Sequence, residues 1–477
     1  MGDSLYQRRK FLKMFGIGMA GFGFAPLACT VQKKQPARPT NFIVIFCDDL
    51  GYGDLGSYGH PTIHTPNVDR MAREGQKWTN FYVASSVCTP SRAALLTGRL
   101  PVRSGMCSNE HRVLFPNSAE GLPPGEVTLA EALKQKDYAT ACIGKWHLGH
   151  RTPHLPTNNG FDTYFGIPYS NDMDRTVEYR KEIFWDPKTD YWNVPLMRDE
   201  EIVERPANQN TLTKRYTEES MKFIEENRTQ PFFLYLAHTM PHVPLFASDE
   251  FDDTSKRGLY GDVVEEIDWS VGKILEKLRE EDLEENTLVV FTSDNGPWLS
   301  FETHGGSAGP LRDGKFTTWE GGMRVPAVFR WPGRIQPGTV MELGSTMDLF
   351  ATFCGLAGAG IPDDRILDSH DLAPVLLEGK SSPRDVLFYY RGEDLFAVRK
   401  GAFKTHFITQ STFGPDKERE RHDPPLLFNL NHDPAEKHNI ADEHPEVIAE
   451  IETVVKEHRA NLVRKRDRLA KWVEQEG

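Results

Sequence analysis

The 477-residue sequence predicts an α/β protein with a doubly wound, mainly parallel sheet and a smaller α+β unit at its C-terminal end. Three observations predict this class. Short runs of β-branched and aromatic residues recur along the chain, helical patterns separate them, and after about residue 380 the pattern changes to short strands with polar turns. Runs that are apolar throughout suit strands buried on both faces of a parallel sheet. We therefore expect a large α/β domain at 37–380 and a small α+β subdomain at 381–477, preceded by a segment at 1–36 that is interpreted below as an export signal and linker.

The main sheet is predicted from five apolar runs. In chain order they are Asn41–Phe46, Ala139–Ile143, Phe232–Leu236, Leu288–Thr292 and the weaker Pro326–Arg330. Two helices are predicted between them. Val127–Gln135 follows a Pro-Gly turn, and Tyr260–Glu280 has apolar residues at helical spacing. Strands that alternate with helices in this way indicate a sheet covered by helices on both faces.

The C-terminal unit is predicted as a small antiparallel sheet with one helix. Its expected strands are Val386–Tyr390, Leu395–Val398, Phe403–Thr409 and Leu426–Leu430. A charged amphipathic helix is expected from about Pro445.

The first thirty residues have the pattern of an export signal. Adjacent arginines at Arg8 and Arg9 precede a short, Gly-rich apolar run over 14–27, which resembles a twin-arginine signal. The run is too short and too rich in glycine for a stable membrane span. We expect export by the twin-arginine machinery to the periplasm, or anchoring at the cell surface by a lipid on Cys29. The alternative is a basic tail on a cytoplasmic protein.

Charge and cysteine content exclude several classes of protein. A net charge of −13 argues against nucleic-acid binding, which needs a basic face. If the substrate is an anion, positive charge must be confined to the site. The six cysteines form neither a disulfide framework nor a pair with zinc-site spacing.

Polar residues follow four of the predicted strands, at the point where each strand ends. Asp48-Asp49 follow the first, Lys145-Trp146-His147 the second, His238 with the nearby His242 the third, and Asp294-Asn295 the fourth. Ligands of open α/β sheets bind at the carboxyl ends of the strands. The sequence therefore predicts one cleft lined by these groups, the alternative being that each pair only caps a helix or solvates a loop.

The acidic groups of this cleft predict a metal site. Asp48, Asp49, Asp294 and Asn295 offer only oxygen, and three carboxylates packed together repel one another unless a cation lies between them. An all-oxygen set fits calcium or magnesium better than zinc.

Cys88 is predicted to lie at the start of a helix. Pro90 is placed for a first helical turn, and alanine and leucine continue the pattern. Unpaired backbone N–H groups and the helix dipole favour an anion at such a position. Taken alone, the segment would also fit an ordinary cysteine beside a capped helix.

Cys-Thr-Pro-Ser-Arg at 88–92, followed by Leu-Thr-Gly-Arg at 96–99, resembles the signature of the type I, formylglycine-dependent sulfatases. Other segments match the family's motifs in the same order. They are Asp-Asp-Leu-Gly-Tyr-Gly at 48–53, Gly-Lys-Trp-His-Leu-Gly at 144–149, His-Thr-Met-Pro-His-Val-Pro at 238–244, Ser-Asp-Asn-Gly at 293–296, and Gly-Lys at 314–315 with Trp-Glu-Gly-Gly at 319–322. By this resemblance, which extends from about Asn41 to Ala460, the chain is identified as a member of that family.

Within the family, the chain resembles arylsulfatase A in the segment 166–170. It resembles N-acetylgalactosamine-6-sulfatase in 256–258, 260–262 and 389–392. The lysosomal members have disulfides that these cysteines do not reproduce. Their compartment and quaternary structure are therefore not transferred to this chain.

The resemblance implies an alkaline-phosphatase-like α/β/α sandwich and two prosthetic groups. A formylglycine-generating enzyme would oxidise Cys88 to formylglycine. A calcium ion would be held by the modified Cys88 and by the cleft's oxygen ligands, which are Asp48, Asp49, Asp294 and Asn295.

The resemblance also implies a role for each remaining polar residue. Lys145 and Lys315, helped by Ser170, would hold the sulfate, and Arg92 would hold the hydrated aldehyde. His242 would protonate the departing alcohol and His147 would accept a proton as sulfate leaves.

Two further histidines are candidates for substrate binding, and for each of them a second interpretation is open. His238 either touches substrate or orients its loop. His406 either resembles a residue at the pocket rim or is a surface histidine on a strand.

The expected function is hydrolysis of sulfate monoesters of carbohydrates of the galactose or N-acetylgalactosamine type, with small aryl sulfates turned over only as surrogates. One alternative is a phosphonate or phosphate ester hydrolase on the same scaffold. The other is a surface lipoprotein that binds sulfated glycans without cutting them. The complete set of nucleophile, metal ligands and histidines argues against a pure binder, which has no need of Cys88.

Overall fold

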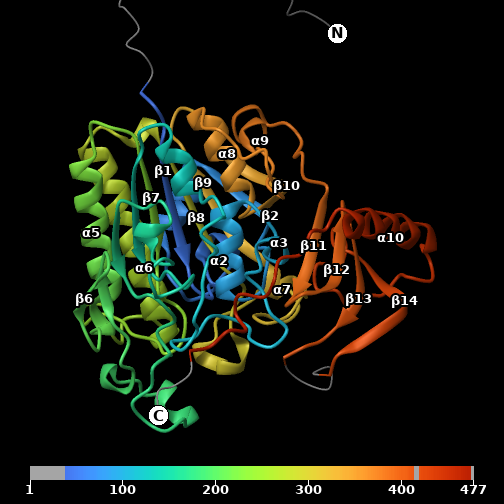
Figure 1. Cartoon of the computed structure of the whole chain (residues 1–477), viewed down its shortest axis with the longest axis horizontal. Coiled ribbons are helices and arrows are strands. Elements are labelled where there is room, and N and C mark those ends of the chain that lie inside the picture. The colour runs from blue at the N-terminus through green and yellow to red at the C-terminus, as the bar shows by residue number, and fades with distance from the viewer. Residues whose placement is uncertain (1–37, 413–417, 474–477) are drawn as a thin grey trace, which may run out of the picture. The chain divides into compact units, whose positions relative to one another are not determined.

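The computed structural model describes residues 38–412 and 418–473, and the residues from Arg38 onward form one compact unit. The predicted export signal lies outside the described residues. Two sheets are present, a large mixed sheet covered by helices and a small antiparallel sheet with one helix (Figure 1). The predicted fold class is confirmed.

The large sheet has ten strands in the order β10-β2-β9-β8-β1-β7-β3-β4-β5-β6. The strands are β1 Asn41–Cys47, β2 Gln76–Tyr82, β3 Ala139–Gly144, β4 Thr163–Gly166, β5 Leu196–Arg198, β6 Glu201–Glu204, β7 Phe232–Ala237, β8 Thr287–Ser293, β9 Arg324–Arg330 and β10 Gly338–Ser345. The neighbours β8, β1, β7, β3 and β4 run parallel, whereas β9, β5 and β6 run antiparallel to the strands beside them. The five predicted strands are β1, β3, β7, β8 and β9.

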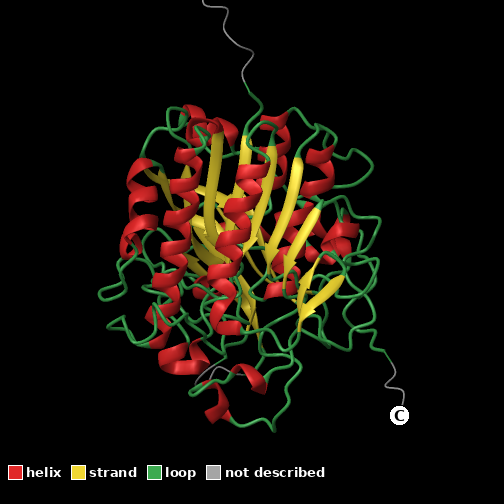
Figure 2. Ribbon diagram, turned by 90° about the vertical axis from the view of Figure 1, so that its left-hand side faces the viewer, coloured by secondary structure: helices red, strands yellow, loops and turns green. Residues whose placement is uncertain are grey.

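Helices cover both faces of this sheet (Figure 2). They are α1 Pro66–Glu74, α2 Cys88–Thr97, α3 Pro101–Ser104, α4 Leu129–Lys134, α5 Leu212–Glu226, α6 Leu259–Glu280, α7 Glu320–Met323, α8 Asp348–Ala357 and α9 Ala373–Glu378. Both predicted helices are present, as α4 and α6.

Strand β1 shows why the sheet's strands are apolar throughout. Phe42, Val44 and Phe46 pack in one hydrophobic core with residues of α2, α4 and α8, while Ile43 and Ile45 pack in the other with residues of α1, α5 and α6. Successive side chains of a strand point to opposite faces, and here each face meets a helix layer.

The small sheet has the strand order β11-β12-β13-β14 and is antiparallel throughout. Its strands are β11 Val386–Arg391, β12 Asp394–Lys400, β13 Phe403–Thr409 and β14 Glu420–Asn429, and its helix is α10 Pro445–Ala460. The apolar face of α10 packs on the sheet through Ile448, Ile451 and Val455. All four predicted strands and the helix are present, although β14 begins six residues before its predicted start.

The five cysteines within the described residues are all free and buried. In the same part of the chain, no helix is both long and apolar enough to cross a membrane.

Candidate active site

The sheet topology brings the four polar strand ends together, as the sequence predicts. Strands β8, β1, β7 and β3 are consecutive neighbours and point the same way, so their carboxyl ends share one edge. Backbone bonds fix the residues just beyond them. The N–H of Asp294 donates to the carbonyl of Cys47 (3.0 Å), and the N–H of Lys145 donates to the carbonyl of Ala237 (2.8 Å).

Cys88 is the first residue of α2 and faces this edge. Its side chain is only 2% exposed, and its thiol donates to Asp48 Oδ1 at 3.4 Å. Burial, and then the Asp48 carboxylate, raise the pKa of the thiol well above its ordinary value. Reactive cysteines instead lie in electropositive, partly exposed surroundings that favour the thiolate. The unmodified thiol is therefore a poor nucleophile here.

Three buried ion pairs involve the predicted carboxylates. Lys145 pairs with Asp48, Lys315 Nζ lies 2.8 Å from Asp49 Oδ2, and Arg92 Nη2 lies 2.9 Å from Asp294 Oδ2. Each of these three carboxylates thus has one cation as a partner, and all six groups are almost completely buried. Asp172 is a fourth carboxylate near Lys315 and Lys145, and burial raises its pKa. The site is a concentrated set of opposite charges inside an acidic protein.

The pKa values show how closely the carboxylates compete. Burial, and next the neighbouring Asp48, raise the pKa of Asp294 to about 7. Burial also opposes ionisation of Asp48, but Lys145 and the other nearby cations hold the pKa of that carboxyl well below its usual range. Additional positive charge at this edge would relieve the repulsion.

The donor set fits a hard cation. Ligand atoms of Asp48, Asp49, Cys88 and His242 lie within 4.8 Å of one another. The Oδ1 atom of Asn295 is buried without a hydrogen-bond partner, while its Nδ2 donates to Asp49 Oδ1 at 2.7 Å. An unpaired buried amide oxygen beside carboxylates is the ligand chemistry that calcium prefers.

His242 has a defined orientation at the site. Its Nδ1 lies 2.6 Å from the carbonyl of Val243 and 3.1 Å from Asn171 Oδ1, so the proton on Nδ1 faces two acceptors. Its Nε2 lies 3.6 Å from Asp49 Oδ2 and 3.5 Å from Ser170 Oγ. Burial, and next Lys315, lower the pKa of His242 well below its ordinary value. Nε2 is the atom available for proton exchange.

His147 is held through its Nε2 atom, whereas His242 is held through Nδ1. Its Nε2 donates to the carbonyl of Leu114 at 2.9 Å, and its Nδ1 is buried without a partner. Burial, and next Lys145, lower the pKa of His147 well below its ordinary value. The ring is therefore neutral, with an unused lone pair on Nδ1.

The three residues assigned to substrate binding differ in position. Ser170 Oγ accepts a hydrogen bond from Lys145 Nζ at 3.1 Å, so Ser170 belongs to the site. His238 is fully buried, and its Nε2 lies 3.3 Å from Ser270 Oγ on α6, contacts that favour its role in orienting the loop.

His406 lies on β13, but the surface position considered for it is wrong. It is fully buried, its Nε2 lies 2.7 Å from Glu436 Oε1, and its ring packs on Trp319 at a centroid distance of 4.3 Å. The buried Glu436 provides the polar partner that makes an interior position tolerable for this histidine.

Two residues of the site are not among the predicted ones. Trp298 lies with its ring centroid 4.3 Å from Lys315 Nζ and 5.5 Å from the ring of His242, while Asn171 contacts His242 directly. Trp298 follows the 293–296 motif by two residues and Asn171 directly follows Ser170, so proximity in sequence is the only signal for either.

Comparison with known proteins gives matches along nearly the whole chain. The family model Sulfatase matches residues 40–359, and the model for the C-terminal region of aryl-sulfatase matches residues 382–476. The chain is 43% identical over 465 residues to N-acetylgalactosamine-6-sulfatase of Canis lupus familiaris, covering 89% of this chain and 87% of that protein. It is 43% identical over 428 residues to arylsulfatase A of Homo sapiens, covering 85% and 84%.

Solved structures agree with these relatives. The PsFucS1 sulfatase from Pseudoalteromonas sp. superposes with a TM-score of 0.79 at 31% identity, covering 90% of this chain and 92% of that one. Ps i-CgsB, solved in complex with k-i-k-neocarrahexaose, superposes with a TM-score of 0.77 at 30% identity, covering 92% and 96%.

Proposed function

This chain belongs to the sulfatase family and is a sulfuric ester hydrolase, and from that premise we propose that it removes sulfate from carbohydrates of the galactose or N-acetylgalactosamine type. We further propose that it uses a formylglycine made from Cys88 and a calcium ion. The observation that supports this chemistry best is the position of Cys88, buried at the start of α2 and hydrogen-bonded to the Asp48 carboxylate, where the raised pKa of the thiol disfavours the thiolate.

The two prosthetic groups would supply what the side chains lack. A hydrated formylglycine at position 88 would supply an oxygen nucleophile and a second hydroxyl for the release of sulfate. Asp48, Asp49, Asp294, Asn295 and the modified Cys88 would hold calcium, which would supply positive charge.

The chain's own cations would hold the sulfate. Lys145 and Lys315 lie at the same edge of the sheet, and Ser170 fixes Lys145 through the 3.1 Å hydrogen bond. Arg92 is held on Asp294 and on the carbonyl of Lys145, beside Cys88 on the same helix. Charge that is preorganised in a dry site is usually the largest contribution to catalysis. Because Asp48, Asp49 and Asp294 each pair with one of these cations, calcium would supply the excess positive charge with which a protein of net charge −13 binds an anion.

The two histidines would move protons at opposite stages. An anionic ester next to His242 raises its affinity for a proton, and Nε2 then donates to the departing alcohol while Nδ1 remains bonded to Val243. His147 has its free lone pair on Nδ1 and accepts the proton that is lost as sulfate leaves.

The carbohydrate assignment is supported by the relatives. One is named for N-acetylgalactosamine 6-sulfate, and one similar structure holds an oligosaccharide. Export would place the enzyme where polysaccharides occur. We propose that Arg8 and Arg9 direct twin-arginine export to the periplasm, that Cys29 accepts the lipid if the protein is anchored, and that a formylglycine-generating enzyme acts before export.

The test is sulfate release from a panel of substrates by purified, matured enzyme. The kcat/KM for 6-sulfated galactose-type oligosaccharides is compared with that for glucosamine-type oligosaccharides and for an aryl sulfate. We expect the galactose type to be highest, because contacts with the sugar orient the ester. If no saccharide exceeds the aryl ester, the carbohydrate assignment is wrong. The Cys88→Ala variant is the control for contaminating activity.

A further inference from the structure

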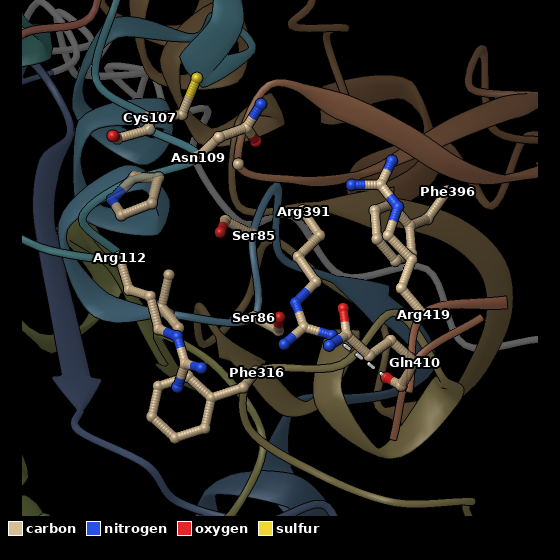
Figure 3. Close-up of a pocket in the computed structure, with 14 residues that line it drawn as sticks. Ser85, Ser86, Cys107, Asn109, Arg112, Phe316, Arg391, Phe396, Gln410 and Arg419 are labelled. Carbon is tan, nitrogen blue, oxygen red and sulfur yellow. Dashed lines mark hydrogen bonds between the residues drawn. The ribbon is translucent and has the colours of Figure 1, made fainter. Parts of the chain in front are cut away.

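A pocket outside the cluster of metal-site residues lies beside the segment that precedes Cys88. Its volume is about 320 Å³, within the range of roughly 300–1,000 Å³ of small-ligand sites. The segment before α2, the loop after α3 and the β11–β12 hairpin contribute lining residues, together with Gln410 after β13 and Arg419 before β14 (Figure 3). Among the lining residues are Ser86, Val87, Arg112, Phe316, Arg391 and Arg419.

The pocket is positively charged. Figure 3 shows Arg391 reaching between Ser86 and Gln410, with Arg112 over the ring of Phe316. Arg419 pairs with Asp394 at 2.9 Å, but within residues 38–412 and 418–473 neither Arg112 nor Arg391 has a salt bridge. Among the described residues, Arg391 donates one hydrogen bond, to the backbone carbonyl of Gln410 at 3.3 Å.

Burial and mutual repulsion act on these guanidinium groups. Burial, and next Arg112 and Arg419, lower the pKa of Arg391 to about 10, and the Asp313 carboxylate opposes the shift. Arg391 therefore remains charged at neutral pH. An incoming anion would relieve the repulsion, as additional positive charge would for the carboxylates of the active site.

The pocket shares its walls with the active site. Val87 and Pro90, which line it, flank Cys88 in the sequence. The ring of Phe316 lies 4.6 Å from the guanidinium of Arg112 and 5.5 Å from Nζ of Lys315. The backbone N–H of Phe316 also donates to the carbonyl of Ser86 at 3.0 Å. Phe316 therefore contacts both Lys315 of the active site and Arg112 of this pocket, so the two sites are neighbours.

The backbone keeps Arg391 in place. Gly392, the next residue, has φ +58°, and a Cβ there would lie 2.3 Å from Asn109 Oδ1 and 2.6 Å from the carbonyl of Ser108. The tight β11–β12 turn can therefore pack against the 107–109 segment only with glycine at this position. The turn fixes the arginine against the loop that precedes Arg112.

We propose that this pocket is a second anion subsite, which binds an acidic group on the sugar next to the one that carries the sulfate to be removed. The proposal rests on the proposed function. Guanidinium groups bind sulfate and carboxylate through paired N–H donors, which a lysine cannot provide. The preferred substrate is accordingly a saccharide with at least two acidic groups, either two sulfates or a sulfate and a uronic acid.

The test compares three disaccharides with the same 6-sulfated N-acetylgalactosamine. Its neighbour is a uronic acid, the same unit with the carboxyl reduced to an alcohol, or the reduced unit with a sulfate added. For wild-type enzyme we expect kcat/KM to be roughly tenfold to a hundredfold higher for the better of the two acidic substrates than for the neutral one, mainly through KM. The acidic substrate with the higher kcat/KM shows whether the pocket prefers a carboxylate or a sulfate.

Variants tie this preference to the pocket. Arg391→Gln and Arg112→Gln should each reduce the ratio of acidic to neutral kcat/KM toward one, and Arg391→Lys should restore part of it. Arg73→Gln, at an exposed position in α1, is the matched control and should keep the wild-type ratio. Melting temperatures verify that each variant is folded.

Three results would overturn the inference. Equal kcat/KM for acidic and neutral disaccharides refutes it while the proposed function stands. A wild-type ratio retained in folded Arg391→Gln and Arg112→Gln also refutes it. Hydrolysis of an aryl sulfate without hydrolysis of any disaccharide shows instead that the carbohydrate assignment has failed, and the subsite with it.

Discussion

Replacing Lys404 by methionine should lower the free energy of unfolding by about 3–5 kcal/mol, the usual cost of leaving a buried charge without its partner. Lys404 Nζ is fully buried between the two sheets and lies 3.0 Å from Glu320 Oε1 and 2.9 Å from Glu436 Oε1. It also donates to the carbonyl of Thr318 at 2.8 Å. Methionine keeps the length of the side chain but removes the charge and all three interactions.

The effect should depend on pH in a defined direction. Burial opposes ionisation of Glu320, but Lys404 and next Arg399 lower the pKa of that carboxyl from 4.5 to about 2. A depressed pKa contributes stability that is fully present above the unfolded value and is lost as pH falls toward the folded one. Lys404→Met removes the main cause of the depression. Its destabilisation should therefore be largest at neutral pH and shrink as the pH falls below about 4.5.

Urea unfolding of the full chain, at neutral pH and at about pH 4, measures this difference. Lys400→Met is the matched control, because Lys400 is partly exposed and pairs with Glu450 at 2.7 Å and Asp385 at 3.4 Å. Exposed pairs contribute about 0–1 kcal/mol. If Lys404→Met is no more destabilising than Lys400→Met at neutral pH, the buried network does not hold the sheets together.

Removal of calcium by a chelator should lower both the melting temperature and the activity, because the buried carboxylates then repel one another. A ligand that binds only the folded state stabilises it by on the order of 3 kcal/mol at a hundredfold excess over Kd. Chelated enzyme that has an empty metal site but keeps its melting temperature and activity would contradict a role for calcium. His242→Ala should lower kcat/KM by roughly 10²–10⁴-fold for sugar sulfates, whose alcohols need a proton, and much less for aryl sulfates with good leaving groups; an equal loss for both classes would argue against a general acid. Replacing Arg8 and Arg9 together with lysine should stop export, which cell fractionation measures, and normal delivery of the double variant would contradict twin-arginine export.

Much of the fold and of the site can be predicted from the sequence, because burial on both faces leaves a simple signal. In β1 every side chain from Asn41 to Cys47 is buried, and a continuous apolar run is the direct result. Asp48, Lys145 and Asp294 interrupt such runs at the strand ends, where parallel topology brings them together. The signal is strong because buried charge is costly unless it serves a ligand or partner.

The rest depends on contacts between distant segments. The strands β5 and β6, the last two at one side of the sheet, are short and partly exposed. Strand β2 mixes polar with aromatic residues, so none of the three shows a buried run. Lys404 and His406 alternate with apolar residues and resemble the exposed face of a strand. Their burial is possible because Lys404 pairs with Glu320, 84 residues away, and His406 pairs with Glu436, 30 residues away. The residue pattern of one strand gives no information about side-chain partners from distant segments.

The central claim is that Cys88 becomes the catalytic group by modification. Mass spectrometry of the peptide that contains Cys88 tests it most directly, on enzyme produced in a host able to make formylglycine. The account predicts an aldehyde in place of the thiol, in a fraction of molecules that matches the active fraction, and a Cys88→Ser variant that folds but is almost inactive. An unmodified thiol at Cys88 in fully active protein would contradict it.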